Sequence, residues 1–261
     1  MRIFTFKGLF LTVIFMLLGN LAIHAADGEL ITKQITLTLD EAGTLPDRIG
    51  ENQKYLITNL KIVGKINGTD LKFIREMAGC DVNGKETDGK LSILDLSDAK
   101  IVEGGSAYYS DRDDGFIYTS NDKLGDYVFN GCSGLTSLTL PSSVTAIGSG
   151  AFNGCSGLTS IYVYMEKLPE TGSNLFLGCD EKNCTVYVPK GTGGAYFRSA
   201  EFGYFYNIVE FDATGIDKVA ISTNVKEVSR YSANGQRLSA PAKGLNFVKY
   251  SDGSVKKVVV Q

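Results

Sequence analysis

Residues 124–140 read LGDYVFNGCSGLTSLTL, and residues 147–163 repeat this stretch as IGSGAFNGCSGLTSIYV. The two copies align without a gap, so that Phe129 and Phe152, like the cysteines and leucines around them, lie 23 positions apart. A fixed period of this length is typical of a solenoid, in which short supersecondary units stack on one another. The sequence therefore predicts an α/β repeat fold with a parallel β-sheet and short helical or irregular turns.

Further strand signals occur on both sides of the twin copies. Residues 57–62 and 91–96 have the spacing L-x-x-L-x-L, which is the strand signature of leucine-rich repeats. Residues 185–189 supply a later strand in which apolar residues alternate with Thr and Tyr. We therefore expect a leucine-rich-repeat solenoid over residues 54–211.

The remaining parts of this region differ from the repeat. Residues 26–53 precede it and are expected to form an N-terminal cap that covers the open end of the core. Residues 69–77 carry apolar residues at helical spacing, and Thr69 or Asp70 is the expected helix cap. Residues 99–122 interrupt the pattern, which predicts an inserted surface loop.

Beyond residue 211 the pattern changes to short alternating segments. The dipeptides Asn234-Gly235 and Asp252-Gly253 separate these segments and are typical of β-hairpin turns. The sequence therefore predicts a small antiparallel β module over residues 214–261.

Residues 1–25 have the features of a cleaved signal peptide. Arg2 and Lys7 precede an apolar run, which ends in small residues suited to processing. The only histidine, His24, lies in this segment, so the mature chain is expected to lack histidine-dependent catalysis and histidine metal sites. Loss of two basic residues lowers the formal net charge from -3 to -5, which argues against a nucleic-acid partner. No later stretch reaches the roughly 18 apolar residues of a transmembrane segment.

Five cysteines are an odd set for an exported protein. Cys132 and Cys155 occupy equivalent repeat positions and are expected on adjacent coils, either as buried apolar thiols or as a bridge between coils. Cys179 and Cys184 are the candidate disulfide pair. The oxidation state of the cysteines stays open at this point.

The motif IGxxAFxxCxxLxxI at residues 147–161 resembles the BspA-like class of bacterial leucine-rich repeats, and the resemblance extends over residues 50–211. It implies a secreted or surface protein of Gram-negative anaerobes of the gut and mouth. Some proteins of this class act as adhesins for host matrix proteins, whereas most have no assigned activity.

The end of the chain resembles the C-terminal sorting domains of type IX secretion. The resemblance rests on YSANGQRL at residues 231–238, KGLNFVK at residues 243–249 and the lysine- and valine-rich residues 252–260. It implies a signal for passage through the outer membrane. A small β domain retained for stability is the alternative.

Two motifs suggest chemistry but lack the surroundings that such chemistry requires. Residues 111–115, DRDDG, resemble part of a calcium loop without its closing glutamate. Residues 168–172, LPETG, spell a sortase signal without the apolar tail that should follow. Glycoside hydrolysis would need two neighbouring acidic side chains, and the outward strand positions bring no such pair together. We therefore expect no catalytic residue, no metal site and no cofactor.

The outer face of the parallel sheet is the predicted binding surface. Within each strand the residue between the last two apolar positions points away from the core, so equivalent positions form rows across the strands. One row contains Lys61, Asp95, Thr139, Tyr162 and Tyr187, and the other contains Asn59, Ile93, Ser137, Ser160 and Thr185. Exposed tyrosines are enriched at recognition surfaces. The alternative is that Tyr162 and Tyr187 only stack to support the sheet.

These observations lead to three hypotheses. The first is a non-enzymatic secreted or cell-surface binding protein that presents the sheet face to a host extracellular-matrix protein, a cell-surface protein or a glycan. The second is a structural envelope protein that self-associates, and the third and most remote is a secreted hydrolase. The identity of the ligand and the oligomeric state stay open.

Overall fold

The structure, a computed structural model of the chain, describes residues 28–111, 115–213, 227–232, 236–250 and 255–260. The expected signal peptide and most of the acidic motif at residues 111–115 lie outside the described residues. Backbone contacts divide the chain into two compact units, Met1–Phe211 and Asp212–Gln261. Within the described part of the chain, no helix has both the length and the apolar character needed to span a membrane.

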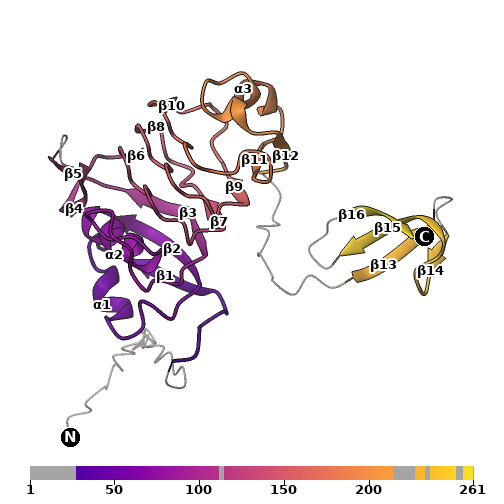
Figure 1. Ribbon diagram of the computed structural model, residues 1–261, viewed down its shortest axis with the longest axis horizontal. Helices are drawn as coiled ribbons and strands as arrows, with labels where there is room; N and C mark the ends of the chain where they lie inside the picture. Colours follow the sequence, from indigo (N-terminus) through magenta and orange to yellow (C-terminus); the bar gives the residue numbers. More distant parts are fainter. Residues whose placement is uncertain (1–27, 112–114, 214–226, 233–235, 251–254, 261) are drawn as a thin grey trace, which may run out of the picture. The chain divides into compact units, whose positions relative to one another are not determined.

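A seven-stranded parallel sheet forms one side of the first unit (Figure 1). Within this sheet each strand pairs with the next of its strands along the chain, so the order in space follows the sequence. The strands that lie between them in the sequence belong to other sheets. The strands are β1 (Ile35–Leu39), β2 (Asn59–Ile66), β3 (Ile93–Ile101), β7 (Ser137–Thr139), β9 (Ser160–Tyr162), β11 (Thr185–Pro189) and β12 (Asn207–Phe211). This arrangement confirms the predicted leucine-rich-repeat solenoid.

A second parallel sheet, of three short strands, lies on another side of the central coils. It consists of β6 (Lys123–Leu124), β8 (Ala146–Ile147) and β10 (Glu170–Thr171), with β8 in the middle. The core between the two sheets contains a ladder of stacked rings, whose centroids are 6.1 Å apart for Phe129 and Phe152 and 5.2 Å apart for Phe152 and Phe176. One ring per coil explains why the sequence repeats its phenylalanine with such regularity.

Helices fill the wider coil at the start of the solenoid. These are α1 (Leu45–Ile49) and α2 (Gly68–Met77). The expected cap at Thr69 or Asp70 is wrong, because the N-cap of α2 is Asn67, whose side chain accepts from the Thr69 N–H while the Asp70 carboxylate accepts from the Asn67 N–H. The buried Asp70 carboxylate also accepts from the N–H groups of Gly43 and Leu45, at 2.6 and 2.9 Å. It therefore ties α2 to the segment that leads into α1.

The predicted surface loop at residues 99–122 is wrong. Strand β3 continues to Ile101, and the insertion then forms an antiparallel hairpin of β4 (Gly104–Asp111) and β5 (Gly115–Thr119). Strand β4 packs against α2, and Tyr108 on this strand is fully buried. The two tyrosines of the insertion, Tyr108 and Tyr109, therefore belong to the core, which their position between glycines and charged residues did not indicate.

A column of backbone hydrogen bonds links the two repeat copies, which form the first coil (residues 124–140) and the second coil (residues 147–163). The N–H of Phe129 donates to the carbonyl oxygen of Ala151, and the bonds above and below it follow the same direction. In the first coil, Val128 and Asn130 occupy the positions equivalent to Ala151 and Asn153, but no earlier coil of the same kind supplies their donors. The guanidinium of Arg75 on α2 donates to the carbonyl oxygens of Val128 and Asn130 instead, at 3.1 and 3.0 Å.

Tyr108 on β4 supplies a donor for another backbone carbonyl of the first coil. Its hydroxyl donates to the carbonyl oxygen of Asp126, at 2.9 Å, which is the first-coil equivalent of the Ser149 carbonyl. The pKa of Tyr108 is raised, first by burial and then by the negative charge of Asp126. Arg75 and Tyr108 together therefore cap the acceptor end of the column.

The last coil is closed by α3 (Gly193–Phe197) and the 3-10 helix η1 (Phe202–Tyr204). The buried rings of Phe202 and Phe205 meet the last ring of the ladder, Phe176, edge-on at 5.2 and 4.8 Å. The carboxylate of Glu201 accepts from the N–H of Leu175 at 2.8 Å, which joins this cap to the coil beneath it.

The second unit contains a four-stranded antiparallel sheet, as the hairpin signals predicted. Its order is β14-β13-β15-β16, with β13 (Glu227–Ser232), β14 (Arg237–Leu238), β15 (Gly244–Tyr250) and β16 (Val255–Val260). A buried Arg230 holds the sheet together, because it pairs with both carboxylate oxygens of Glu227 and donates to the side-chain oxygen of Asn246.

Candidate binding face of the solenoid

The sheet register aligns the two predicted rows. Pairing of β2, β3, β7, β9 and β11 places Lys61, Asp95, Thr139, Tyr162 and Tyr187 side by side, and Asn59, Ile93, Ser137, Ser160 and Thr185 beside them. The alternation of buried and outward residues within each strand produces this alignment. The structure thus brings the candidate residues onto one face, and their burial divides that face into three parts.

The first part is an ion cluster on β2 and β3. The Lys61 ammonium lies 2.8 Å from a carboxylate oxygen of Asp95, 2.9 Å from one of Asp98 and 3.0 Å from the Ser97 hydroxyl. Burial acts to lower the pKa of Lys61, but the hydrogen bonds to Asp95 and Asp98 outweigh it, so the pKa is raised. Lys61 and Asp95 therefore form an ion pair that links β2 to β3.

Asp98 joins this cluster because of a register shift between β2 and β3, which lies between Lys61 and Val63. The shift inserts an extra residue on β3 and turns a second carboxylate toward the same ammonium. The expectation that no two acidic side chains meet on this face is therefore wrong. No sequence signal indicated the irregularity, since the L-x-x-L-x-L spacing of β3 is intact.

The second part is the polar middle of the face. Ser137 and Thr139 were predicted to contact a partner, but each is only 6% exposed. The reason is their size, since Thr139 lies in register between the longer side chains of Asp95 and Tyr162. These two residues therefore support the face, whereas Ser160 and Thr185 remain half-buried and accessible.

The third part is the aromatic end, formed by Tyr162, Tyr164, Tyr187 and Phe211. The rings of Tyr162 and Tyr187 are stacked with centroids 4.5 Å apart and planes inclined by 6°. Phe211 meets Tyr164 edge-on at 5.0 Å and Tyr162 at 6.5 Å. All four rings are half-buried, and Val209 beside them in register is 43% exposed.

Tyr164 and Phe211 were not among the residues predicted from the sequence. Each lies two positions beyond a residue of the first row or its continuation on β12, so the alternation of a strand was the signal that could have found them. The pKa of Tyr164 is raised, first by burial and then by the carboxylate of Asp95. The hydroxyl of Tyr164 therefore lies within electrostatic reach of the ion cluster, so the aromatic end and the ion cluster are neighbours.

The five cysteines of the chain all lie in the described residues and are free, buried thiols. The candidate disulfide between Cys179 and Cys184 is not formed. The thiol of Cys179 instead donates to the carbonyl oxygen of Phe152 at 3.3 Å, and the thiol of Cys155 donates to that of Phe129 at 3.1 Å. Burial raises the pKa of Cys132, Cys179 and Cys184 to about 12. The thiols thus serve as apolar core residues that also satisfy backbone carbonyls.

No group of three or more acidic, cysteine or histidine residues that could hold a metal ion occurs in the part of the chain that the structure describes. The geometry of the first unit is that of a leucine-rich-repeat solenoid with a mixed aromatic and charged sheet face.

Comparison with known families specifies the repeats. Residues 116–237 match the family model described as BspA type Leucine rich repeat region (6 copies). The repeats of this stretch are therefore of the BspA type, and proteins with such repeats are commonly surface proteins or adhesins and typically not enzymes. The matched range runs past Phe211, where the parallel sheet ends, into the antiparallel strands β13 and β14. A search of curated proteins finds no match.

Proposed function

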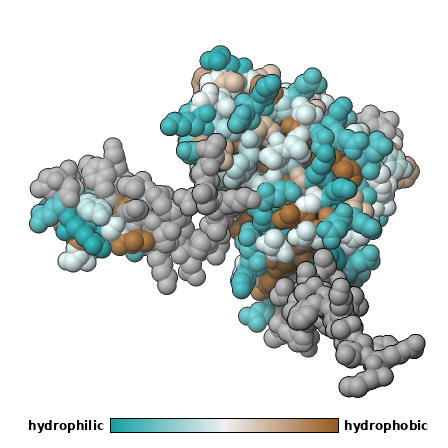
Figure 2. Space-filling view, turned by 180° about the vertical axis from the view of Figure 1, so that it is seen from behind, coloured by the Kyte–Doolittle hydropathy of each residue, from teal (hydrophilic) through white to brown (hydrophobic). Residues whose placement is uncertain are grey.

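We propose that this chain is a secreted or cell-surface binding protein, which engages a cell-surface protein, a host matrix protein or a glycan through the aromatic end of its sheet face. The observation that carries the proposal is the stack of Tyr162 on Tyr187, framed by Tyr164 and Phe211 on adjoining strands. On the side of the first unit shown in Figure 2, hydrophobic residues form separate patches among hydrophilic ones. Apolar patches surrounded by polar residues commonly mark interaction sites, so a localised aromatic cluster on such a surface is suited to recognition of a partner.

The stack favours a protein partner over a glycan. Tyr162 and Tyr187 each cover one flat face of the other, and Thr139 and Val209 flank the outer faces in register, so the rings offer edges and hydroxyl groups more than a free platform for a sugar ring. Tyrosines held in this way lose little conformational entropy on binding, and their hydroxyls supply hydrogen bonds at the rim. The neighbouring ion cluster adds a net negative charge, because it joins one ammonium to two carboxylates.

Binding of the chain of residues 26–261 to immobilised matrix proteins, mucins and glycans tests the proposal. Tyr162→Ala combined with Tyr187→Ala is expected to abolish saturable binding, while Tyr162→Phe combined with Tyr187→Phe keeps the stack and weakens binding less. The matched control is Phe116→Ala combined with Tyr118→Ala, which removes two rings that are 68% and 55% exposed on β5, away from the sheet face. Equal loss of binding in the control and the test variant would contradict the proposed site.

We also propose that the chain is exported, with residues 1–25 as a cleaved signal peptide and residues 214–261 as a type IX sorting domain. The supporting observations are the basic and apolar pattern of the first segment and the hairpin motifs of the second. Expression of the full chain and of a chain that ends at residue 213, in a bacterium with this secretion system, tests the second role. Sorting by the C-terminal module predicts that the shortened chain stays in the periplasm, whereas surface delivery of both chains would assign the module to stability alone.

A further inference from the structure

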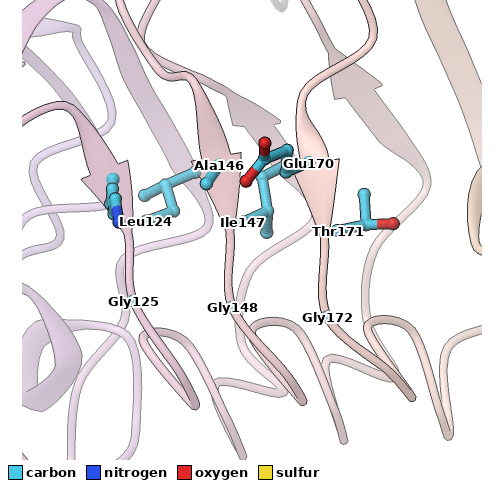
Figure 3. A pocket seen from close by; sticks show the side chains of 9 residues that line it. Leu124, Gly125, Ala146, Ile147, Gly148, Glu170, Thr171 and Gly172 are labelled. Carbon is cyan, nitrogen blue, oxygen red and sulfur yellow. The ribbon is translucent and has the colours of Figure 1, made fainter.

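A hollow of about 270 Å³ lies over the three-stranded sheet of β6, β8 and β10 (Figure 3). Alternation along these strands turns Leu124 and Ile147 into the core, where they are 0% and 1% exposed. The residues before them, Lys123 and Ala146, and Glu170 in the same row of β10, therefore face outward. The register aligns these three residues directly across the sheet.

The floor of the hollow has almost no side chains. Gly125, Gly148 and Gly172 follow the outward row on the three strands, and Ala146 stands at its centre. The glycines are dictated by packing, since a Cβ on Gly148 would lie 2.3 Å from a carboxylate oxygen of Asp126. Their consequence on the outside is a flat strip of backbone, to which another polypeptide can approach closely.

The rim of the hollow carries two opposite charges. Lys123 on β6 and Glu170 on β10 are both exposed, and within the described residues neither side chain forms an ion pair or a side-chain hydrogen bond. They stand two strand spacings apart, about 10 Å between the backbones, with only the methyl group of Ala146 between them. Lys61 and Asp95, which lie on adjacent strands of the other sheet, do meet at 2.8 Å.

From this arrangement we infer that the face of β6, β8 and β10 is a self-complementary contact between two copies of the chain. The row Lys123, Ala146, Glu170 changes sign about its centre. A two-fold axis that runs parallel to the strands, in the plane of contact above Ala146, therefore places each Lys123 opposite Glu170 of the second copy, and forms two equivalent ion pairs. A second copy of the chain uses both charges and the symmetry of the row.

The contact is small. Stable dimers bury about 800 Å² on each partner, and three strands of two residues offer less than this. The dimer is therefore weak and concentration-dependent. Because its sheet is separate from the seven-stranded sheet, dimerisation leaves the aromatic end uncovered, and each dimer carries two copies of it. The inference does not depend on the proposed function.

Sedimentation equilibrium of the chain of residues 26–261, from about 5 µM to about 500 µM at low salt, tests the inference. Wild type is expected to show a monomer–dimer equilibrium. Lys123→Glu and Glu170→Lys each turn two attractions into two repulsions, which should raise the dissociation constant by about 10- to 30-fold. The matched controls Lys90→Glu and Glu86→Lys make the same changes of charge at exposed positions off this face and should leave the dissociation constant unchanged.

Two restorations make the test specific for the two-fold geometry. The double variant Lys123→Glu with Glu170→Lys exchanges the charges and should dimerise as wild type does. An equimolar mixture of the two single variants should form a heterodimer, because the new carboxylate of the first variant then faces the new ammonium of the second; a mixture of the two control variants should not gain affinity. The inference is overturned if wild type stays monomeric over the whole range, if the single variants dimerise as wild type does, or if neither restoration occurs.

Discussion

Replacement of Arg75 by methionine should destabilise the solenoid more than any other exchange of a single charged residue in the first unit. Arg75 is fully buried, and its guanidinium donates to four backbone carbonyl oxygens, those of Tyr127, Val128, Asn130 and Asp81, at 3.0 to 3.1 Å. It also lies 4.9 Å from the centre of the Tyr109 ring. Methionine keeps most of the apolar stem, so the experiment isolates the loss of these donors.

The magnitude follows from what remains after the exchange. Hydrogen bonds to a charged group contribute about 1.5 to 3 kcal/mol each, but bonds made by one group are not additive. Removal of one side of a buried charged network costs about 3 to 5 kcal/mol, because the other side stays buried without partners. We therefore expect Arg75→Met to lower the free energy of unfolding by about 3 to 5 kcal/mol, and Arg75→Lys by roughly half as much, since an ammonium cannot serve four carbonyls in a fixed fork.

Urea unfolding followed by far-UV circular dichroism measures the change, with Arg198→Met as the control at an exposed arginine. Amide hydrogen exchange locates it, because the bonds from Tyr127 and Phe129 to the second coil should open more often than the equivalent bonds from Gly150 and Phe152 to the third. A loss below about 1 kcal/mol for Arg75→Met, or exchange that rises equally in all coils, would refute the view that Arg75 stands in for a missing repeat.

The remaining predictions concern three other buried groups. Tyr108→Phe removes the donor to Asp126 and should cost about 1 to 2 kcal/mol in the same urea assay. Asp70→Ala removes the acceptor of three backbone N–H groups, including the capping box, and should cost about 2 to 4 kcal/mol, with little effect from the exposed control Asp47→Ala. The buried thiols have pKa values raised from 9.0 to about 12, so the folded state keeps protons that the unfolded state loses; stability should be complete below pH 9 and fall between pH 9 and 12. At about pH 8.5 iodoacetamide should label these thiols only after denaturant is added, and rapid labelling of the native chain would contradict the burial.

The twin copies were enough to predict the sheet. Each copy places its apolar residues at the same spacing, and a parallel ladder is the arrangement in which equal repeats bury equal positions. The predicted alignment of Thr139 with Tyr162, and of Tyr162 with Tyr187, follows from the same rule and agrees with the register. Repetition therefore determines which residues share a row.

Repetition does not determine how far each residue of a row stands above the sheet. Ser137 and Thr139 share rows with half-buried tyrosines and threonines, yet they are buried because longer neighbours surround them. The capture of Asp98 by Lys61 depends on a local register shift that leaves the apolar spacing unchanged. Both outcomes depend on side-chain size and backbone detail across strands, which a pattern along one strand does not contain.

The acceptor end of the hydrogen-bond column marks the limit of prediction more sharply. The direction of the column implies that the carbonyls of Asp126, Val128 and Asn130 need donors, because each later coil receives its donors from the coil before it. This requirement can be derived from the repeat alone. The identity of the donors cannot, because any segment of sufficient reach would satisfy the same carbonyls. Arg75 comes from a helix and Tyr108 from an insertion, and neither has a counterpart one period away. A residue that ends a repeat must lie outside it, so periodicity predicts the need for such a residue and conceals which one it is.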